Sequence, residues 1–134
     1  MGIALRWALA VCWMGGIFYL SQQSSPLGAS PGDLSYLAHL GIYAVLAMLL
    51  YWALWTAVAR EDPELELIVA TVAFGLTVLY GVSDEIHQSF VPGRTASERD
   101  LAMDALGAFL GLSLALLAQQ ALAGIRRPRP SETP

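Results

Sequence analysis

Four long apolar segments, separated by short polar links, dominate this sequence of 134 residues. They cover residues 7–20, 36–59, 65–82 and 101–123. A helix that crosses a bilayer needs about 20 mainly apolar residues, so the second and fourth segments are long enough, the third nearly so, and the first is short. Only 13% of the residues are charged, whereas soluble domains carry roughly 25%. The sequence therefore predicts an all-α integral membrane bundle of four transmembrane helices.

The first apolar segment has two interpretations. It follows Arg6, as the apolar part of a secretory signal peptide would. However, the residues after it, YLSQQSSP, contain no small-residue cleavage site, and the Arg6 side chain can reach the interface and so lengthen the span. We expect this helix to be retained within a single membrane domain, residues 1–125. The basic, proline-rich residues 126–134 are predicted to be a disordered tail.

Arginine supplies every basic residue of the chain apart from the two histidines, and its distribution predicts the topology. With both termini in the cytoplasm, Arg94 and Arg99 lie outside. The cytoplasmic side then receives Arg6, Arg60, Arg126, Arg127 and Arg129. Because positive residues are enriched in cytoplasmic loops, we expect both termini to be cytoplasmic. The net charge of −4 comes from acidic residues in the links, and nothing here points to nucleic acid.

A polar stretch, SDEIHQSFVPGR (residues 83–94), lies at the end of the third apolar segment. If the third helix begins near Pro63, Asp84 lies about 31 Å further along, at the outer edge of the hydrocarbon. His39 and Asp104 each lie about two turns into helices that begin on that same side. Three helices therefore bring ionisable side chains to a similar depth.

The spacing of these residues also places them on one face of each helix. The three stripes are Asp84, His87 and Gln88; Asp100, Asp104, Gly107 and Gly111; and Tyr36, His39 and Tyr43. Glycines four residues apart allow a neighbouring helix to approach closely. We therefore expect the acids to face another helix, where the histidine and tyrosines can donate hydrogen bonds to them.

The link before the last helix carries recognisable turn signals. Residues 91–94, VPGR, place proline and glycine where a type II turn needs them. Thr95 and Glu98 have the spacing of a capping box for the last helix.

A purely structural interpretation of the polar residues stays open. Ionisable groups at the centre of a membrane helix cost about 2.5–3.5 kcal/mol each and usually mark function. Near the interface the cost falls, and the same groups can cap helices or tie them together at about 0.6 kcal/mol per hydrogen bond. Arg94 and Arg99 are expected to pair with the acids or with lipid phosphates. The tryptophans and Tyr51 are interpreted as interface or lipid-facing residues, and the single Cys12 as a small buried hydrophobic side chain.

The stretch SDEIHQSFVPGRTASERDLAMDALGAFLG closely resembles the signature of the VanZ-like family of small bacterial membrane proteins. The upstream LSYLAHLGIYAVLAMLL is similar to the family's second helix, with a histidine followed four residues later by tyrosine. The resemblance covers about residues 33–112. One departure is Tyr36, where relatives often have lysine. The matching positions are His39, Tyr43, Ser83, Asp84, Glu85, Gln88, Pro92, Arg94, Asp100, Asp104 and Gly107.

The resemblance implies a multipass protein of the bacterial cytoplasmic membrane with a role in the cell envelope. The family takes its name from a member linked to teicoplanin resistance, so an effect on glycopeptide susceptibility is an expectation. The family's reaction, if any, is not fixed, so enzymatic activity is left open.

Three kinds of function fit these residues. The first is binding or shielding of a lipid head group, either a phospholipid or a prenyl-linked cell-wall intermediate, at the outer leaflet. Its candidate binding residues are Tyr43, Ser83, Gln88, Arg94 and Asp100, with Arg94 on a phosphate. The second is acid–base chemistry on such a head group, with candidate residues His39, Asp84, Glu85, His87 and Asp104. The third is a proton-coupled carrier, which four helices would support only as a homo-oligomer.

A metal site is a further alternative. Carboxylates and imidazoles together can hold a divalent cation. No H-x-x-x-H or H-E-x-x-H spacing occurs, so zinc has no local motif and no cofactor is expected from the sequence.

Overall fold

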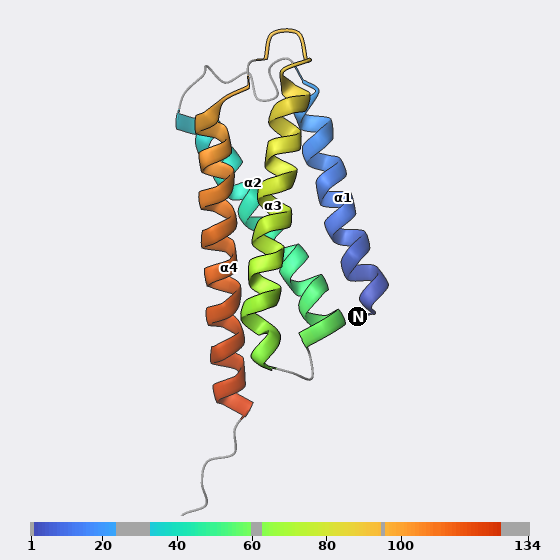
Figure 1. The fold of residues 1–134 in the computed structure, drawn as a ribbon, viewed down its shortest axis with the longest axis vertical. Coiled ribbons are helices and arrows are strands. Elements are labelled where there is room, and N and C mark those ends of the chain that lie inside the picture. Colours follow the sequence, from blue (N-terminus) through green and yellow to red (C-terminus); the bar gives the residue numbers. More distant parts are fainter. Residues whose placement is uncertain (1, 24–32, 60–62, 95, 127–134) are drawn as a thin grey trace, which may run out of the picture.

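The computed structural model describes residues 2–23, 33–59, 63–94 and 96–126. Within them the chain forms α1 (Ile3–Ser21), α2 (Asp33–Leu54), α3 (Glu66–Gln88) and α4 (Glu98–Arg126), and no strand (Figure 1). Each helix includes a stretch long and apolar enough to cross a membrane. The prediction of an all-α bundle with four candidate spans is confirmed. Residues 127–134 lie outside the described residues, so the disordered tail stays a prediction. Thr95 also lies outside them.

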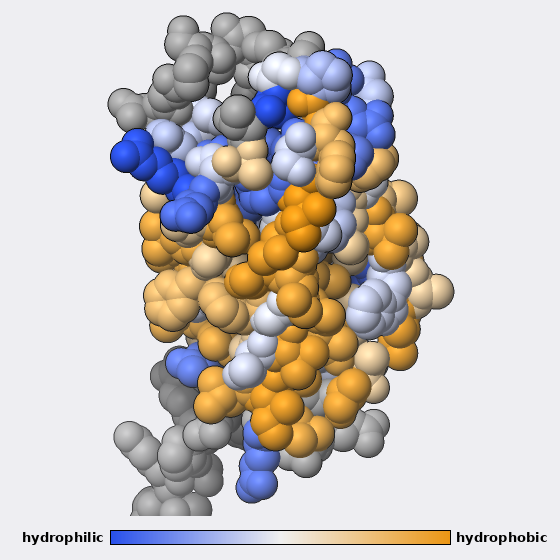
Figure 2. All heavy atoms as spheres, turned by 45° about the horizontal axis from the view of Figure 1, so that its top comes forward, coloured by the Kyte–Doolittle hydropathy of each residue, from blue (hydrophilic) through white to orange (hydrophobic). Residues whose placement is uncertain are grey.

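The outer surface of the bundle is apolar over most of its length. Leu79, Phe109 and Leu117 are among the large apolar side chains that point away from the other helices. Figure 2 shows a broad orange band of hydrophobic residues on one face of the bundle, with hydrophilic residues gathered toward the top. A water-soluble helical protein buries such side chains, whereas a membrane helix leaves them against lipid. The hydrophilic end lies where α3 ends and α4 begins, and we call it the site end.

The closest helix contact lies between α2 and α4, and two glycines make it. A Cβ atom on Gly107 would lie 2.2 Å from the carbonyl oxygen of Leu40, and one on Gly111 would lie 2.3 Å from that of Ala44. Only hydrogen fits at either position. The close approach predicted from the glycine spacing is therefore found, and α2 is the neighbour.

Hydrogen bonds to backbone carbonyls attach α1 to the other helices. The indole Nε1 of Trp13 donates to the carbonyl of Ile42 at 3.0 Å, and the Tyr80 hydroxyl donates to that of Met14 at 2.6 Å. The expectation that Trp13 simply faces lipid or the interface was thus incomplete, because its ring nitrogen joins α1 to α2. Cys12 is exposed on α1, so the expectation that it is buried within the protein was wrong.

The end of the bundle opposite the site end has its own polar contact. The Tyr51 hydroxyl donates to Oε1 of Glu66 at 2.9 Å, and Tyr51 is buried. Tyr51 therefore does not face lipid, whereas its interpretation as a residue at the depth of the interface stays a prediction. After Leu54 the chain widens into a π-helical turn, Trp55–Ala59, followed by a 3₁₀ turn, Pro63–Leu65, that leads into α3.

The link between α3 and α4 contains the predicted type II turn. Arg94 N–H donates to the carbonyl of Val91 at 3.1 Å, and Gly93 has φ 82°, a value that suits the third position of this turn. The residue that caps α4 is Ser97, whose Oγ accepts from Asp100 N–H at 3.3 Å. The capping residue proposed from sequence, Thr95, lies outside the described part of the chain.

A polar cavity and a carboxylate cluster at the site end

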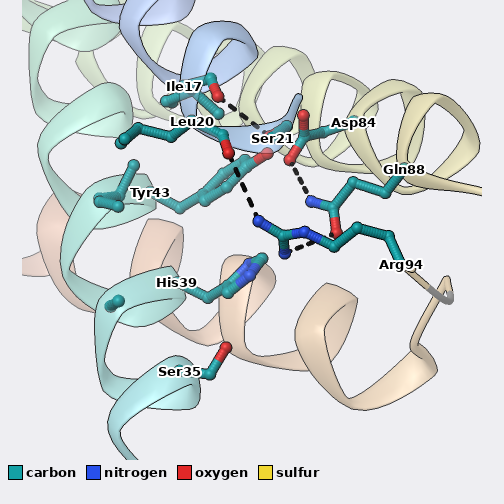
Figure 3. Close-up of a pocket in the computed structure, with 11 residues that line it drawn as sticks. Ile17, Leu20, Ser21, Ser35, His39, Tyr43, Asp84, Gln88 and Arg94 are labelled. Atoms are coloured by element: carbon teal, nitrogen blue, oxygen red, sulfur yellow. Dashed lines mark hydrogen bonds between the residues drawn. The ribbon is translucent and has the colours of Figure 1, made fainter. Parts of the chain in front are cut away.

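A cavity of about 160 Å³ lies at the site end between α1, α2 and α3 (Figure 3). One wall is mainly apolar and comes from α1 and α2; the other is polar and comes from α3 and the link after it. The lining residues are Ile17, Leu20, Ser21, Ser35, Ala38, His39, Ile42, Tyr43, Asp84, Gln88 and Arg94. Five of the residues that sequence reasoning selected therefore share one cavity.

A chain of hydrogen bonds forms the polar wall. Gln88 Nε2 donates to Oδ2 of Asp84 at 3.0 Å, and Arg94 Nη1 donates to Oε1 of Gln88 at 3.2 Å. Asp84 and Gln88 are one helical turn apart and both are buried. The amide of Gln88 thus connects the carboxylate of Asp84 to the guanidinium of Arg94 by one hydrogen bond to each.

Arg94 also holds the end of α1. Its Nε donates to the carbonyl of Gln23 at 2.9 Å, and its Nη2 donates to that of Leu20 at 3.4 Å. Leu20 belongs to the last turn of the helix and Gln23 lies just beyond it, where carbonyl oxygens lack the N–H partner four residues ahead that they have inside a helix. Among the described residues neither Arg94 nor Arg99 forms an ion pair with an acid. Of the two expected partners, the acids are thus not paired with either arginine in the described part of the chain, and pairing with lipid phosphates stays a prediction.

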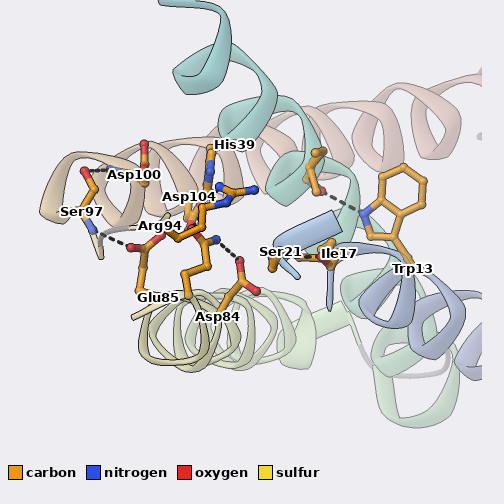
Figure 4. Close-up of polar contacts among 12 residues, drawn as sticks. Trp13, Ile17, Ser21, His39, Asp84, Glu85, Arg94, Ser97, Asp100 and Asp104 are labelled. Atoms are coloured by element: carbon orange, nitrogen blue, oxygen red, sulfur yellow. Dashed lines mark hydrogen bonds and ion pairs between the residues drawn. The ribbon is translucent and has the colours of Figure 1, made fainter. Parts of the chain in front are cut away.

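A second group of polar side chains lies beside the cavity, between α2, α3 and α4 (Figure 4). Nδ1 of His39 lies 2.9 Å from Oδ1 of Asp104, which has no exposed surface. Gly81 of α3 provides the room, because a Cβ atom there would lie 3.1 Å from Oδ2 of Asp104. His39 belongs both to this group and to the cavity wall.

Glu85 and Asp100 complete this group, which we call the carboxylate cluster: His39, Glu85, Asp100 and Asp104. One potential ligand atom each from His39, Glu85 and Asp100 lie within 4.8 Å of one another. Oε2 of Glu85 also accepts from Ser97 N–H at 2.7 Å. An acid of α3 therefore binds the backbone amide of the residue that caps α4, as the glutamate of a capping box would do from within its own helix.

Several buried oxygen atoms of the cluster have no hydrogen-bond partner. They are Oδ2 of Asp104, Oε1 of Glu85 and Oδ1 of Asp100, and the buried Tyr43 hydroxyl is also without one. Buried polar groups normally find partners, and unpaired buried charge is costly. The cluster thus has room for a partner that the described residues do not supply.

Three residues selected from the sequence lie elsewhere. His87 turns toward α1, where its ring contacts that of Phe18 in a tilted arrangement with centroids 4.5 Å apart. Ser83 is exposed and its Oγ donates to the carbonyl of Tyr80. Tyr36 has no hydrogen bond to the cluster among the described contacts. Conversely, sequence reasoning missed Ile17, Leu20 and Ser21, because α1 carries no acidic or basic residue near them that would mark a site.

Four apolar helices around a buried polar site define a multipass membrane protein with ionisable groups inside its helical bundle. The chain belongs to the VanZ/LLP1 family, whose sequence model matches residues 6–119. This match begins within α1 and extends well beyond the region of resemblance seen in the sequence. No curated protein and no solved structure shows significant similarity to the chain.

Proposed function

We propose that this protein binds the phosphate-bearing head group of a membrane lipid in the cavity at the site end. The observation that carries the proposal is the position of Arg94 in the cavity wall. A guanidinium has five N–H donors, and three of them are used by Gln23, Gln88 and Leu20. Two donors remain for a phosphate, a pairing for which arginine is well suited.

The size and lining of the cavity support a head group rather than a whole lipid. Pockets for drug-sized ligands usually measure about 300–1,000 Å³, whereas this cavity has about 160 Å³. That volume accepts a phosphate and a few attached atoms. The acyl or prenyl chains would remain outside, along the exposed apolar faces of the helices.

We further propose that the cavity faces the outer leaflet of the bacterial cytoplasmic membrane. Support comes from the arginine distribution, which favours cytoplasmic termini and places the α3–α4 link on the other side. Prenyl-linked cell-wall intermediates and phospholipids are the lipids to test. If the protein binds such a cell-wall intermediate, a glycopeptide antibiotic has less access to its target. This connects the site to teicoplanin susceptibility.

Native mass spectrometry of the purified protein tests the proposal. We expect a phosphate-bearing lipid to stay bound to the natural chain, and to be lost in Arg94→Gln but not in Arg99→Gln. The matched control is apt because Arg99 is exposed and near the same end of the bundle.

A second pair of variants avoids disturbing the Arg94 contacts. Ala38→Leu fills the cavity from α2, and Ala102→Leu adds the same atoms at an exposed position of α4. Only Ala38→Leu is expected to release the lipid. Equal retention by all four variants would refute binding in this cavity.

A second candidate function is catalysis on the head group, favoured by the contact between His39 and Asp104. A carboxylate on one ring nitrogen of histidine orients the ring and leaves the other nitrogen for proton transfer. His39 also lines the cavity. Turnover of a bound lipid, lost in His39→Gln while lipid retention persists, would distinguish an enzyme from a binding protein. The proton-coupled carrier stays a prediction.

A further inference from the structure

We propose that the carboxylate cluster binds a divalent metal ion through His39, Glu85 and Asp100. The three side chains come from α2, α3 and α4, and their potential ligand atoms lie within 4.8 Å of one another. Ligands at about 2.0–2.2 Å from a common ion lie roughly 3–4 Å apart. Small side-chain rotations would therefore bring all three onto one ion.

The balance of charge in the cluster calls for a cation. Glu85, Asp100 and Asp104 contribute three carboxyl groups, and within the cluster the ion pair found is the one between His39 and Asp104. Arg94, the nearest arginine along the link, is bonded to backbone carbonyls and Gln88 instead. Each carboxyl group also keeps one buried oxygen without a hydrogen-bond partner. A cation that binds several of these oxygens at once would both balance the negative charge and give the unpaired oxygens a partner.

Glu85 gives an independent indication of a ligand. Its side chain is 6% exposed, and one oxygen is fixed by Ser97 N–H while the other, Oε1, has no partner. A glutamate that served only to cap α4 would not require a second buried oxygen beside two other potential ligands. The hydrogen bond to Ser97 instead holds the carboxylate in place, as contacts behind a metal ligand commonly do.

Asp104 supports His39 in the same way that the Ser97 amide supports Glu85, by a contact on the side away from the proposed metal. It binds Nδ1 of the ring, which leaves Nε2 as the nitrogen for a metal. Carboxylate–histidine–metal arrangements of this kind fix the ring and make the nitrogen more basic. We assign Asp104 as a positioning residue and the other three as ligands.

The ligand set selects the class of metal. Imidazole suits zinc and other transition metals, carboxylates suit manganese, magnesium and calcium, and the combination favours Zn²⁺ or Mn²⁺. The ligands lie on three different helices, which explains why no local metal-binding motif occurs. The site does not depend on the proposed lipid, although His39 lines both the cavity and the cluster.

The test uses the full chain in lipid-free detergent, treated with a chelator and then titrated with Zn²⁺ or Mn²⁺ alone. We expect calorimetry and elemental analysis to find about one bound ion per chain, because a preformed ligand set binds metal stoichiometrically. Asp100→Asn and Glu85→Gln should lose it, and Asp104→Asn should bind it about 10–100-fold more weakly.

Two variants serve as matched controls. His87→Gln removes a histidine of the site end that lies against Phe18, and Glu66→Gln removes an acid at the opposite end of the bundle. Both should bind metal like the natural chain. Asp100→Asn protects the test against misfolding, because no described contact uses the Asp100 side chain as a hydrogen-bond partner. Failure of the natural chain to bind either ion, or equal loss in the controls, would overturn the proposal.

Discussion

His39 and Asp104 are 65 positions apart in the chain, and their side chains meet at 2.9 Å between α2 and α4. The contact lies close to the glycine seam, by which we mean the positions Gly107 and Gly111 where the backbones of α2 and α4 come together; Gly107 lies against the backbone of Leu40. The hydrogen bond between His39 and Asp104 and the close backbone contact at Gly107 thus lie near each other along the interface of α2 and α4. This combination makes the α2–α4 interface the natural place to test what holds the bundle together.

The first prediction concerns the acceptor on Asp104. Asp104→Ala should lower the free energy of unfolding by about 1–3 kcal/mol, because it leaves the buried Nδ1 of His39 without a partner. Asp104→Asn keeps an acceptor oxygen of similar size and should cost less. SDS titration followed by tryptophan fluorescence measures both. Equal stability of the natural chain and the alanine variant would mean that the hydrogen bond contributes nothing.

The second prediction concerns the glycine seam. Gly107→Ala should destabilise the protein by about 1–3 kcal/mol, because its Cβ would overlap the carbonyl oxygen of Leu40 and force α2 and α4 apart. Gly75→Ala is the matched control, since a Cβ there meets nothing within 4 Å. That variant should be neutral or gain about 0.5–1 kcal/mol from better helix propensity. The same SDS titration measures both variants. An unchanged free energy of unfolding in Gly107→Ala would refute the close contact.

The third prediction concerns the attachment of α1. Tyr80→Phe removes the 2.6 Å hydrogen bond to Met14 and keeps the ring. We expect a loss of about 0.6 kcal/mol and at most about 1.7 kcal/mol, as for other hydrogen bonds between membrane helices. Disulfide crosslinking between α1 and α3 should become slower. Unchanged crosslinking and stability would show that apolar packing alone holds α1.

The fourth prediction concerns topology. In a Cys12→Ser background, Ser89→Cys places the only thiol at an exposed position of the site end. An impermeant maleimide should label it in intact cells. Gln120→Cys, exposed toward the far end of α4, should react only after permeabilisation. The reverse pattern would place the site end in the cytoplasm.

Much of the bundle followed from the sequence because hydrophobic length and glycine spacing act locally. Segment length gave the four spans, and Gly107 and Gly111 predicted a close helix neighbour. The similar depth of His39 and Asp104 also anticipated that these two residues would meet. Each of these inferences depends on the pitch of a single helix and on the thickness of the membrane.

What could not be predicted is the neighbour that each side chain faces. Asp84, His87 and Gln88 share a stripe of α3, yet His87 turns to Phe18 whereas Glu85, which lies off that stripe, joins the cluster. The rotation of α3 against α1 and α4 decides this, and it depends on packing among all the helices. Similarly, the bonds from Arg94 to the end of α1 join distant parts of the chain.

The glycine seam has a consequence for how the cavity can change shape. Because no side chain separates the backbones of α2 and α4 at Gly107 and Gly111, we expect the two helices to stay together and the His39 wall of the cavity to move little. The α1 wall is held by the packing of Ala10 and Ile17 in the hydrophobic core and by the hydrogen bonds of Trp13, Tyr80 and Arg94. Only Ala10, Ile17 and Ser21 of α1 are buried, so we expect any widening of the cavity for a bulkier ligand to come from movement of α1 outward toward the lipid.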